Sequence, residues 1–363
     1  MSDFEKKLYV YIGTYTSSGS KGIYIYEMDP ESGKLESAGT SSEIANPSYI
    51  TVSSDRKFLY ATAETETFSG ANGGAVAAYM LEKHTGKLMF LNSVSTKGSM
   101  PCHLSTDKAN RYLFAANYGE GSLTVFNLHS DGSVGSVASY IRHHGSGPVA
   151  DRQEKPHVHF TGLTPDEKLL CAVDLGTDSI VAYGLDTGRQ GGVLYEKTSV
   201  PVKPGSGPRH LEFSNDGRFI WVINELSSDI VSYSCDTSRH SFTELQTIST
   251  LPEACTEVNY CAAIHLSPDG NFLYASNRGH DSIVKYVVDK STGLLSKPHF
   301  TSSEGAWPRD FAFDPSGSFL YAANQVSGSV TAFKIDTDTG NPVTLGWKLE
   351  IPDPVCIKIV KLP

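Results

Sequence analysis

The sequence lacks long apolar segments and has no excess of positive charge. No apolar run approaches the length of a membrane-spanning helix or of the core of a signal peptide, and residues 1–7 are polar and charged. The formal net charge of −10 argues against a nucleic-acid partner, which would need a basic face. The sequence therefore predicts a cytoplasmic protein that binds neither membranes nor nucleic acids.

Recognised motifs for metals, nucleotides and nucleophilic catalysis are also missing. The six cysteines have no Cys-x-x-Cys or Cys/His spacing, so we expect neither a metal site nor a structural disulfide. The glycine-rich segments at 19–22 and 205–209 match neither a P-loop nor a dinucleotide-binding fingerprint. Because no nucleophile elbow or His-Glu-x-x-His motif occurs either, we expect an activity that needs no cofactor.

Helical periodicity is absent, and a strand motif recurs in its place. No stretch longer than a turn shows a 3.6-residue period, whereas glycine turns alternate with aromatic and β-branched runs. The motif is an aromatic or aliphatic strand, then a small residue and a polar pair. Its seven copies begin at Leu8, Phe58, Tyr112, Leu169, Phe219, Phe272 and Phe319, at intervals of 50, 54, 57, 50, 53 and 47 residues. A repeat of this length with several short strands is typical of β-propeller blades.

Each repeat contains four strands. A hairpin such as SNDGRF (214–219) precedes the motif, a strand often opened by proline precedes the hairpin, and two further strands joined by a glycine turn follow. The C-terminal segment 354–360 reads as a first strand without a second, while the N-terminal copy is a second strand without a first. We therefore predict an all-β, seven-bladed propeller of four antiparallel strands per blade, one domain over residues 1–363. Pairing of its C-terminal strand with the N-terminal strands would close the ring and remove open sheet edges.

The period places two rings of residues around the propeller axis. The ring at the end of the second strands holds Thr14 or Tyr15, Glu64, Tyr118, Leu175, Glu225, Arg278 and Gln325. The ring at the start of the first strands holds Tyr49, His103, His157 and His159, Arg209 and His210, Ala262 and Ala263, and Arg309 and Asp310. These charges are consistent with a hydrated channel whose groups pair with one another, but we favour a binding site for a small anion.

The residue types in the rings suit an anionic substrate. Arg209 and Arg278 offer planar forks that match carboxylate or phosphate. The histidines titrate near neutral pH, and a Glu225 held between cations would stay ionised and orient or deprotonate a water. Clustered charge in a concave mouth is typical of a functional site.

At these residues the sequence resembles the lactonase family of seven-bladed propellers. The matching segments are YVYIGTYT near the start, KPHVHF with CAVDLGTD, GSGPRHLEF with VINEL, LYASNRGHDSI, and the segment from Trp307 to Asp336, so the resemblance spans nearly the whole chain. The family includes a bacterial 6-phosphogluconolactonase and fungal carboxymuconate-lactonising enzymes. In the lactonising branch the catalytic set resembles one histidine, two arginines and one glutamate.

The resemblance implies site residues and a reaction. The histidine falls on His157 or His159, which the motif does not separate, and the others fall on Arg209, Glu225 and Arg278. We expect Glu225, His157, His159 and Arg278 to be catalytic. We expect the substrate to contact Arg209, His210, His103, Arg309 and Tyr118. Of these, His103, Arg309 and Tyr118 are placed by ring position alone.

The reaction implied is hydrolysis of a sugar-acid lactone, 6-phosphogluconolactone first of all, as in the pentose phosphate pathway. The alternatives are a lactonising enzyme acting on a carboxymuconate and a non-catalytic propeller scaffold. A WD-repeat scaffold is disfavoured because the period is near 50 and no Trp-Asp dipeptide occurs. The expected partner is a small anionic substrate, a phosphorylated lactone or a polycarboxylate, and the expected state is a monomer or a weak homodimer.

Overall fold

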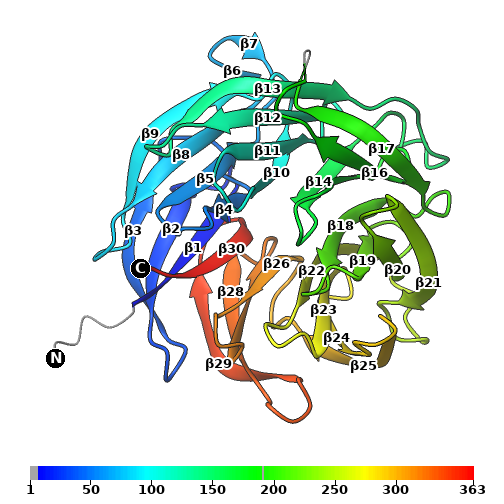
Figure 1. Ribbon diagram of the computed structural model, residues 1–363. Helices are drawn as coiled ribbons and strands as arrows, with labels where there is room; N and C mark the ends of the chain where they lie inside the picture. The colour runs from blue at the N-terminus through cyan, green and yellow to red at the C-terminus, as the bar shows by residue number, and fades with distance from the viewer. Residues whose placement is uncertain (1–6, 190–191) are drawn as a thin grey trace.

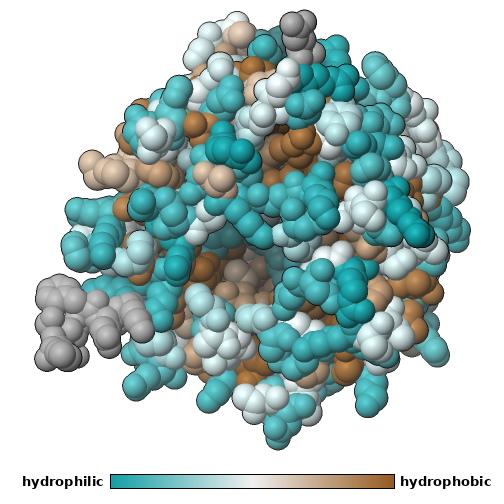
Figure 2. Space-filling view, viewed as in Figure 1, coloured by the Kyte–Doolittle hydropathy of each residue, from teal (hydrophilic) through white to brown (hydrophobic). Residues whose placement is uncertain are grey.

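Seven four-stranded antiparallel sheets are arranged in a ring (Figure 1). The computed structural model describes residues 7–189 and 192–363. This part of the chain contains no helix long and apolar enough to cross a membrane. Figure 2 shows a largely hydrophilic face that is hollowed near its centre. The predicted seven-bladed, all-β fold is confirmed.

Each blade has one strand at each of four positions, counted outward from the axis. The innermost strands are β30 (Pro354–Lys361), β4 (Ile50–Val52), β10 (Pro101–Thr106), β14 (Val158–Leu163), β18 (Pro208–Phe213), β22 (Tyr260–Leu266) and β26 (Pro308–Phe313). The second strands are β1 (Leu8–Thr14), β5 (Phe58–Ala63), β11 (Tyr112–Asn117), β15 (Leu170–Asp174), β19 (Phe219–Asn224), β23 (Phe272–Arg278) and β27 (Phe319–Asn324). The third strands are β2 (Ile23–Met28), β8 (Ala75–Leu81), β12 (Ser122–Leu128), β16 (Ser179–Leu185), β20 (Asp229–Asp236), β24 (Ser282–Val288) and β28 (Ser329–Ile335). The outer strands are β3 (Leu35–Ser41), β9 (Leu88–Ser95), β13 (Val134–Arg142), β17 (Leu194–Pro201), β21 (Ser241–Ser249), β25 (Leu295–Ser302) and β29 (Pro342–Glu350).

The ring closes through the two ends of the chain, as predicted. Strand β30 pairs antiparallel with β1, with Leu8 opposite Lys361 and Ile12 opposite Ile357. The first sheet therefore has the order β3-β2-β1-β30 (blue and red in Figure 1). Two features were not predicted: β4 begins at Ile50 rather than at Pro47, and β6 (Thr67–Phe68) and β7 (Ala71–Asn72) form a small extra hairpin.

The second strands are buried on both faces because each blade is covered by its two neighbours. Successive side chains of a strand point to opposite faces. On β1, Tyr9 and Tyr11 therefore pack with residues of the second blade, whereas Val10 and Ile12 pack with residues of the seventh. Strands without a solvent face are continuously apolar, which explains why the sequence motif LYVYIGT does not alternate with polar residues.

Aromatic residues of the second strands tie neighbouring blades together through glycine turns. Tyr274 Oη donates to the carbonyl of Gly340 (2.5 Å) and Tyr321 Oη to that of Gly33 (2.6 Å), in each case in the next blade. Gly340 has a φ of 71°, and a Cβ there would lie 2.7 Å from the Phe272 ring. Only glycine fits both the backbone conformation and the close approach.

Candidate active site

A repeated β-bulge shapes the start of the innermost strands. The register shifts between Pro101 and His103, between Val158 and Phe160, between Pro208 and His210, and between Pro308 and Asp310. A bulge adds a residue on one strand and re-aims its side chain. As a result the adjacent side chains of Arg209 and His210 are both buried at the axis, only 2% and 7% exposed.

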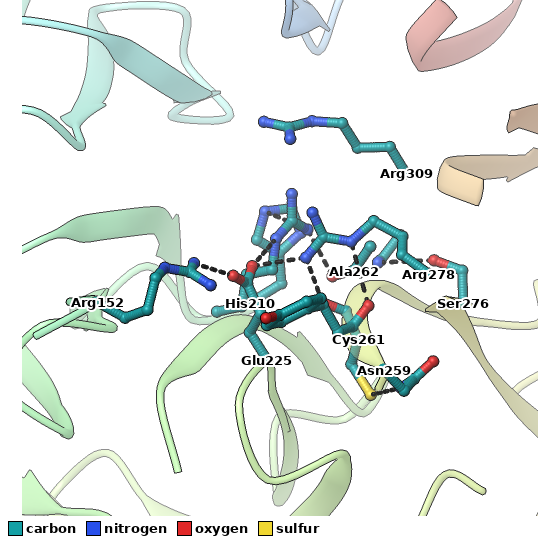
Figure 3. A network of polar contacts seen from close by, with 12 residues as sticks. Arg152, His210, Glu225, Asn259, Cys261, Ala262, Ser276, Arg278 and Arg309 are labelled. Atoms are coloured by element: carbon teal, nitrogen blue, oxygen red, sulfur yellow. Dashed lines mark hydrogen bonds and ion pairs between the residues drawn. The ribbon is translucent and has the colours of Figure 1, made fainter. Parts of the chain in front are cut away.

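The centre of the site is Glu225, which follows β19 and accepts contacts from three arginines (Figure 3). Arg278 Nη2 lies 2.7 Å and Arg209 Nε 3.2 Å from Glu225 Oε2. Arg152 binds Oε1 from the opposite side to Arg278. The period predicted that Glu225, Arg209 and Arg278 would meet, and the structure brings them together.

The arginines control the ionisation of this buried cluster. Burial alone would raise the pKa of Glu225, but Arg278, Arg209 and Arg152 outweigh it and hold the pKa well below the usual carboxyl range. Burial, together with the charges of Arg278 and Arg309, lowers the pKa of Arg209 to about 9. At neutral pH the cluster therefore holds an ionised carboxylate among protonated guanidinium groups.

The two candidate histidines have different surroundings. His159, on β14, has a buried Nδ1 with no hydrogen-bond partner among the described residues. It also lies close enough to Glu225 to affect the pKa of that carboxyl. Burial and the nearby Arg209 hold the pKa of His159 well below its usual range, so its ring is neutral.

His157 is occupied at both ring nitrogens. Nδ1 lies 2.9 Å from the carbonyl oxygen of Tyr118, and Nε2 lies 3.1 Å from a carboxylate oxygen of Glu154. Its ring stacks on that of Tyr118 at a centroid distance of 4.3 Å. Both nitrogens face acceptors, so His159 rather than His157 has a nitrogen available to take a proton.

A second carboxylate–arginine group lies at the same end of the channel. Arg309 Nη2 donates to Tyr15 Oη (3.0 Å), which in turn donates to Glu64 Oε1 (2.9 Å). Arg309 lies apart from the Glu225 cluster in Figure 3. Its charge nevertheless lowers the pKa of Arg209, so the two groups share one electrostatic environment.

The charged groups of this mouth do not balance. Four arginines (Arg152, Arg209, Arg278 and Arg309) face three glutamates (Glu64, Glu225 and the Glu154 beside His157), an excess of one positive charge. The protein as a whole carries a formal charge of −10. The excess is therefore local, and it would attract an anionic ligand to this mouth.

His103 and His210 lie deeper, toward the other end of the innermost strands. Their ring centroids are 5.2 Å apart, and both residues line a cavity of about 350 Å³ that opens at that end. Lys358 and His265 line the same cavity. Of the expected substrate contacts, Arg209, Tyr118 and Arg309 therefore lie at the arginine-rich mouth, whereas these two histidines form the channel wall below it.

His265 joins two carboxylates at this lower end. Its Nε2 lies 3.2 Å from Asp310 and its Nδ1 3.5 Å from Glu212. Burial lowers the pKa of His265, but hydrogen bonds to Asp310 and Glu212 outweigh it and raise the pKa. Burial raises the pKa of Asp310, but Lys358 and His265 lower it to about 2.

Arg152 is the site residue that the sequence analysis missed. It belongs to the long connection between β13 and β14, outside the four repeated strands. Tyr118 interacts with its guanidinium, so the loop is tied to the mouth. Because this connection is longer than the corresponding connection in every other blade, the repeat gave no signal for Arg152. No group of three or more histidine, cysteine or acidic side chains within residues 7–189 and 192–363 is arranged to hold a metal ion.

Known proteins share both the sequence and the fold. The chain matches the family described as "Lactonase, 7-bladed beta-propeller" over residues 9–359. It is 39% identical to the 6-phosphogluconolactonase of Bacillus subtilis over 350 residues, 96% of this chain and 97% of that protein. It is 32% identical to the 6-phosphogluconolactonase of Formosa agariphila, over 84% of this chain and 86% of that one.

Solved structures give the same result. The periplasmic gluconolactonase of Pseudomonas aeruginosa superposes with a TM-score of 0.93 at 33% identity. The superposition covers 98% of this chain and 100% of that one. The similarity in sequence and in fold thus extends over almost the full length of both partners. This chain belongs to the lactonase family of seven-bladed β-propellers.

Proposed function

We propose that this protein hydrolyses 6-phosphogluconolactone to 6-phosphogluconate. The observation that carries the proposal is the convergence of Arg152, Arg209 and Arg278 on Glu225 beside a neutral His159. The excess of positive charge at this mouth suits a substrate that bears a phosphate group. The relatives named 6-phosphogluconolactonase support the same substrate.

In the proposed reaction, a ring nitrogen of His159 accepts a proton from a water molecule as the water oxygen attacks the lactone carbonyl carbon. The carbonyl oxygen becomes an oxyanion, which a guanidinium of Arg278 or Arg209 stabilises. The tetrahedral intermediate then collapses, the bond between the carbonyl carbon and the ring oxygen breaks, and the ring oxygen takes the proton from His159. The product is the open-chain acid.

The geometry changes the role first expected for Glu225. Both of its carboxylate oxygens accept contacts from arginines, so the carboxylate is engaged by cations on each side. We therefore assign it to holding Arg209 and Arg278 in position, with His159 as the proton acceptor.

The direct test is turnover by the purified full chain, corrected for spontaneous lactone hydrolysis. We expect hydrolysis of 6-phosphogluconolactone with a higher kcat/KM than for unphosphorylated gluconolactone. His159→Gln should lower kcat by about 10²–10⁴, the contribution of a positioned base. His157→Gln, in the same segment, should cost less than tenfold, because its ring nitrogens are engaged with protein acceptors. The tenfold limit corresponds to roughly 1.4 kcal/mol, near the upper value for a hydrogen bond.

Two results would contradict the assignment. One is an unchanged kcat in His159→Gln, and the other is formation of a lactone from a carboxymuconate with no action on sugar lactones.

The cytoplasmic location is a further proposal, and the P. aeruginosa relative is named as periplasmic. Fractionation of cells that express the full-length gene would test it.

A further inference from the structure

One backbone position recurs just before the innermost strands, next to the proline that leads into most of them. The carbonyl of this residue accepts the N–H of the residue that ends the neighbouring second-strand motif, as in Glu225 N to Gly207 O (2.7 Å) and Gln325 N to Trp307 O (3.0 Å). In five blades this residue has a positive φ: Asn46 (48°), Met100 (53°), Gly207 (60°), Trp307 (67°) and Asp353 (46°).

Tryptophan is a poor choice for this conformation. Glycine, asparagine and aspartate are the residues that adopt the left-handed region most readily, and three of the five blades use them. A bulky side chain there stores backbone strain, which persists in proteins mainly where the side chain has a function. Met100 carries the same strain, so it provides an internal comparison.

The indole of Trp307 lies against an arginine of the site. The Arg278 guanidinium carbon is 5.6 Å from the centre of the indole ring. Trp307 is held in place by its backbone N–H, which donates to Asp281 Oδ1 (2.8 Å). Its ring also contacts that of Tyr260 at 6.0 Å, and Tyr260 in turn lies 5.5 Å from the guanidinium carbon of Arg152.

Arg278 is also held by three hydrogen bonds to protein groups. Its Nε donates to the Tyr260 carbonyl (3.1 Å), and its Nη2 donates to the Cys261 carbonyl (2.9 Å) and to Glu225 (2.7 Å). Its Nη1 has no hydrogen-bond partner within the described residues. The contact with the Trp307 indole adds to these hydrogen bonds in holding the guanidinium, and so in setting the direction in which Nη1 points.

We propose that Trp307 is a positioning residue for the anionic substrate, and that it acts through Arg278. Its indole holds the guanidinium plane so that Nη1 stays directed at the substrate anion. The strained backbone at Trp307 is retained because asparagine or glycine would relieve the strain but release Arg278. This inference rests on the proposed function, because it assigns a role within the same site.

The test is a double-mutant cycle of Trp307→Asn and Arg278→Lys, with kcat/KM for 6-phosphogluconolactone as the first readout. The second readout is the Kd for inorganic phosphate, measured by calorimetry, which needs no turnover. Trp307→Asn should lower kcat/KM and weaken phosphate binding by about tenfold, as expected for a desolvated cation–π contact. In the Arg278→Lys background the same change should cost less than about twofold, since coupled residues are not additive. Trp307→Phe should recover most of the loss.

Met100→Asn is the matched control, because it relieves the same strain in another blade without touching an arginine of the site. It should leave kcat/KM and the phosphate Kd within about twofold of the wild type. The proposal would be overturned if Trp307→Asn lowered kcat/KM and phosphate affinity as much in the Arg278→Lys background as in the wild type. It would also be overturned if Trp307→Asn and Met100→Asn had equal effects. A wild-type protein that binds phosphate but hydrolyses no lactone would instead refute the proposed function. The double-mutant cycle measured by phosphate binding would still decide the role of Trp307.

Discussion

Replacing Glu225 by glutamine tests whether the arginine cluster depends on one carboxylate. The substitution keeps the side-chain shape but leaves Arg209 and Arg278, both buried, and Arg152 without their counter-charge. Removing one partner of a buried ion pair costs about 3–5 kcal/mol. With an unfolding entropy of about 2.1 cal/mol/K per residue over 363 residues, this predicts a thermal midpoint lower by about 4–7 °C.

Inorganic phosphate should reverse much of this loss. In Glu225→Gln the arginines have no carboxylate to compete with an added anion, so phosphate should bind more tightly than it binds the wild type. At a concentration of about one hundred times Kd, binding contributes about 2.7 kcal/mol, or roughly 3–4 °C here. Calorimetric midpoints of both proteins, with and without phosphate at constant ionic strength, provide the measurement.

The pH dependence of the same variant has a defined sign. A depressed carboxyl pKa contributes stability above the unfolded value of about 4.3, and this stability is lost only as pH falls through the folded value. The pKa of Glu225 is held well below the usual range, so the difference between wild type and variant should stay constant from about pH 5 to 8. Glu212→Gln, at the other end of β18, is the control and should shift the midpoint by less than about 2 °C, because Glu212 is partly exposed and its ion pair is weak. Equal midpoints for Glu225→Gln and the wild type, with no larger response to phosphate, would refute the reasoning.

Three further predictions concern the scaffold. Gly340→Ala and Gly346→Ala place alanine at the same φ of 71°, but only the first brings a Cβ within 3 Å of a ring, so urea unfolding should show Gly340→Ala to be less stable by about 1–3 kcal/mol; equal losses would contradict the tight packing. The raised pKa of His265 gives it a stabilising contribution that is complete below about pH 6.5 and is lost as pH rises through the folded pKa. In urea unfolding, His265→Gln should therefore lose more stability at about pH 5.5 than at about pH 9. A larger loss at the higher pH would show that the sign is wrong. Deletion of residues 354–363 removes several buried apolar side chains worth about 1.5–3 kcal/mol each, whereas the total free energy of unfolding of a protein is typically about 5–15 kcal/mol. The truncated chain should therefore aggregate or lack a cooperative thermal transition. A normal thermal midpoint would show that closure of the ring is dispensable.

The repeat predicted most of the fold and the centre of the site. Because each unit is equivalent, the period alone placed Arg209, Glu225 and Arg278 near one axis, although the three belong to a segment of 70 residues. The burial of the second strands followed from their continuous apolar sequence. Strand limits such as the late start of β4 were not predictable, because they depend on local hydrogen bonds.

The rest of the site depends on non-repeating geometry. Arg152 lies in a loop that is longer than its counterparts, so no periodic pattern indicated it. The choice between His157 and His159 depended on which ring nitrogens find acceptors, and sequence does not contain that information. His103 and His210 follow the period, but the depth of their side chains in the channel depends on the bulges and on the neighbouring rings.

The pairing of β30 with β1 has a consequence for biosynthesis. Every other strand described here precedes β30 in the chain, so six blades can form from consecutive segments while the inner edge of β1 still lacks its partner. A nascent chain on the ribosome therefore exposes an unpaired edge until β30 emerges, which makes that stage the most prone to misassembly. A circular permutant that joins the present ends and opens the chain between β3 and β4 would build all seven sheets from continuous segments. Its folding yield should exceed that of the natural order.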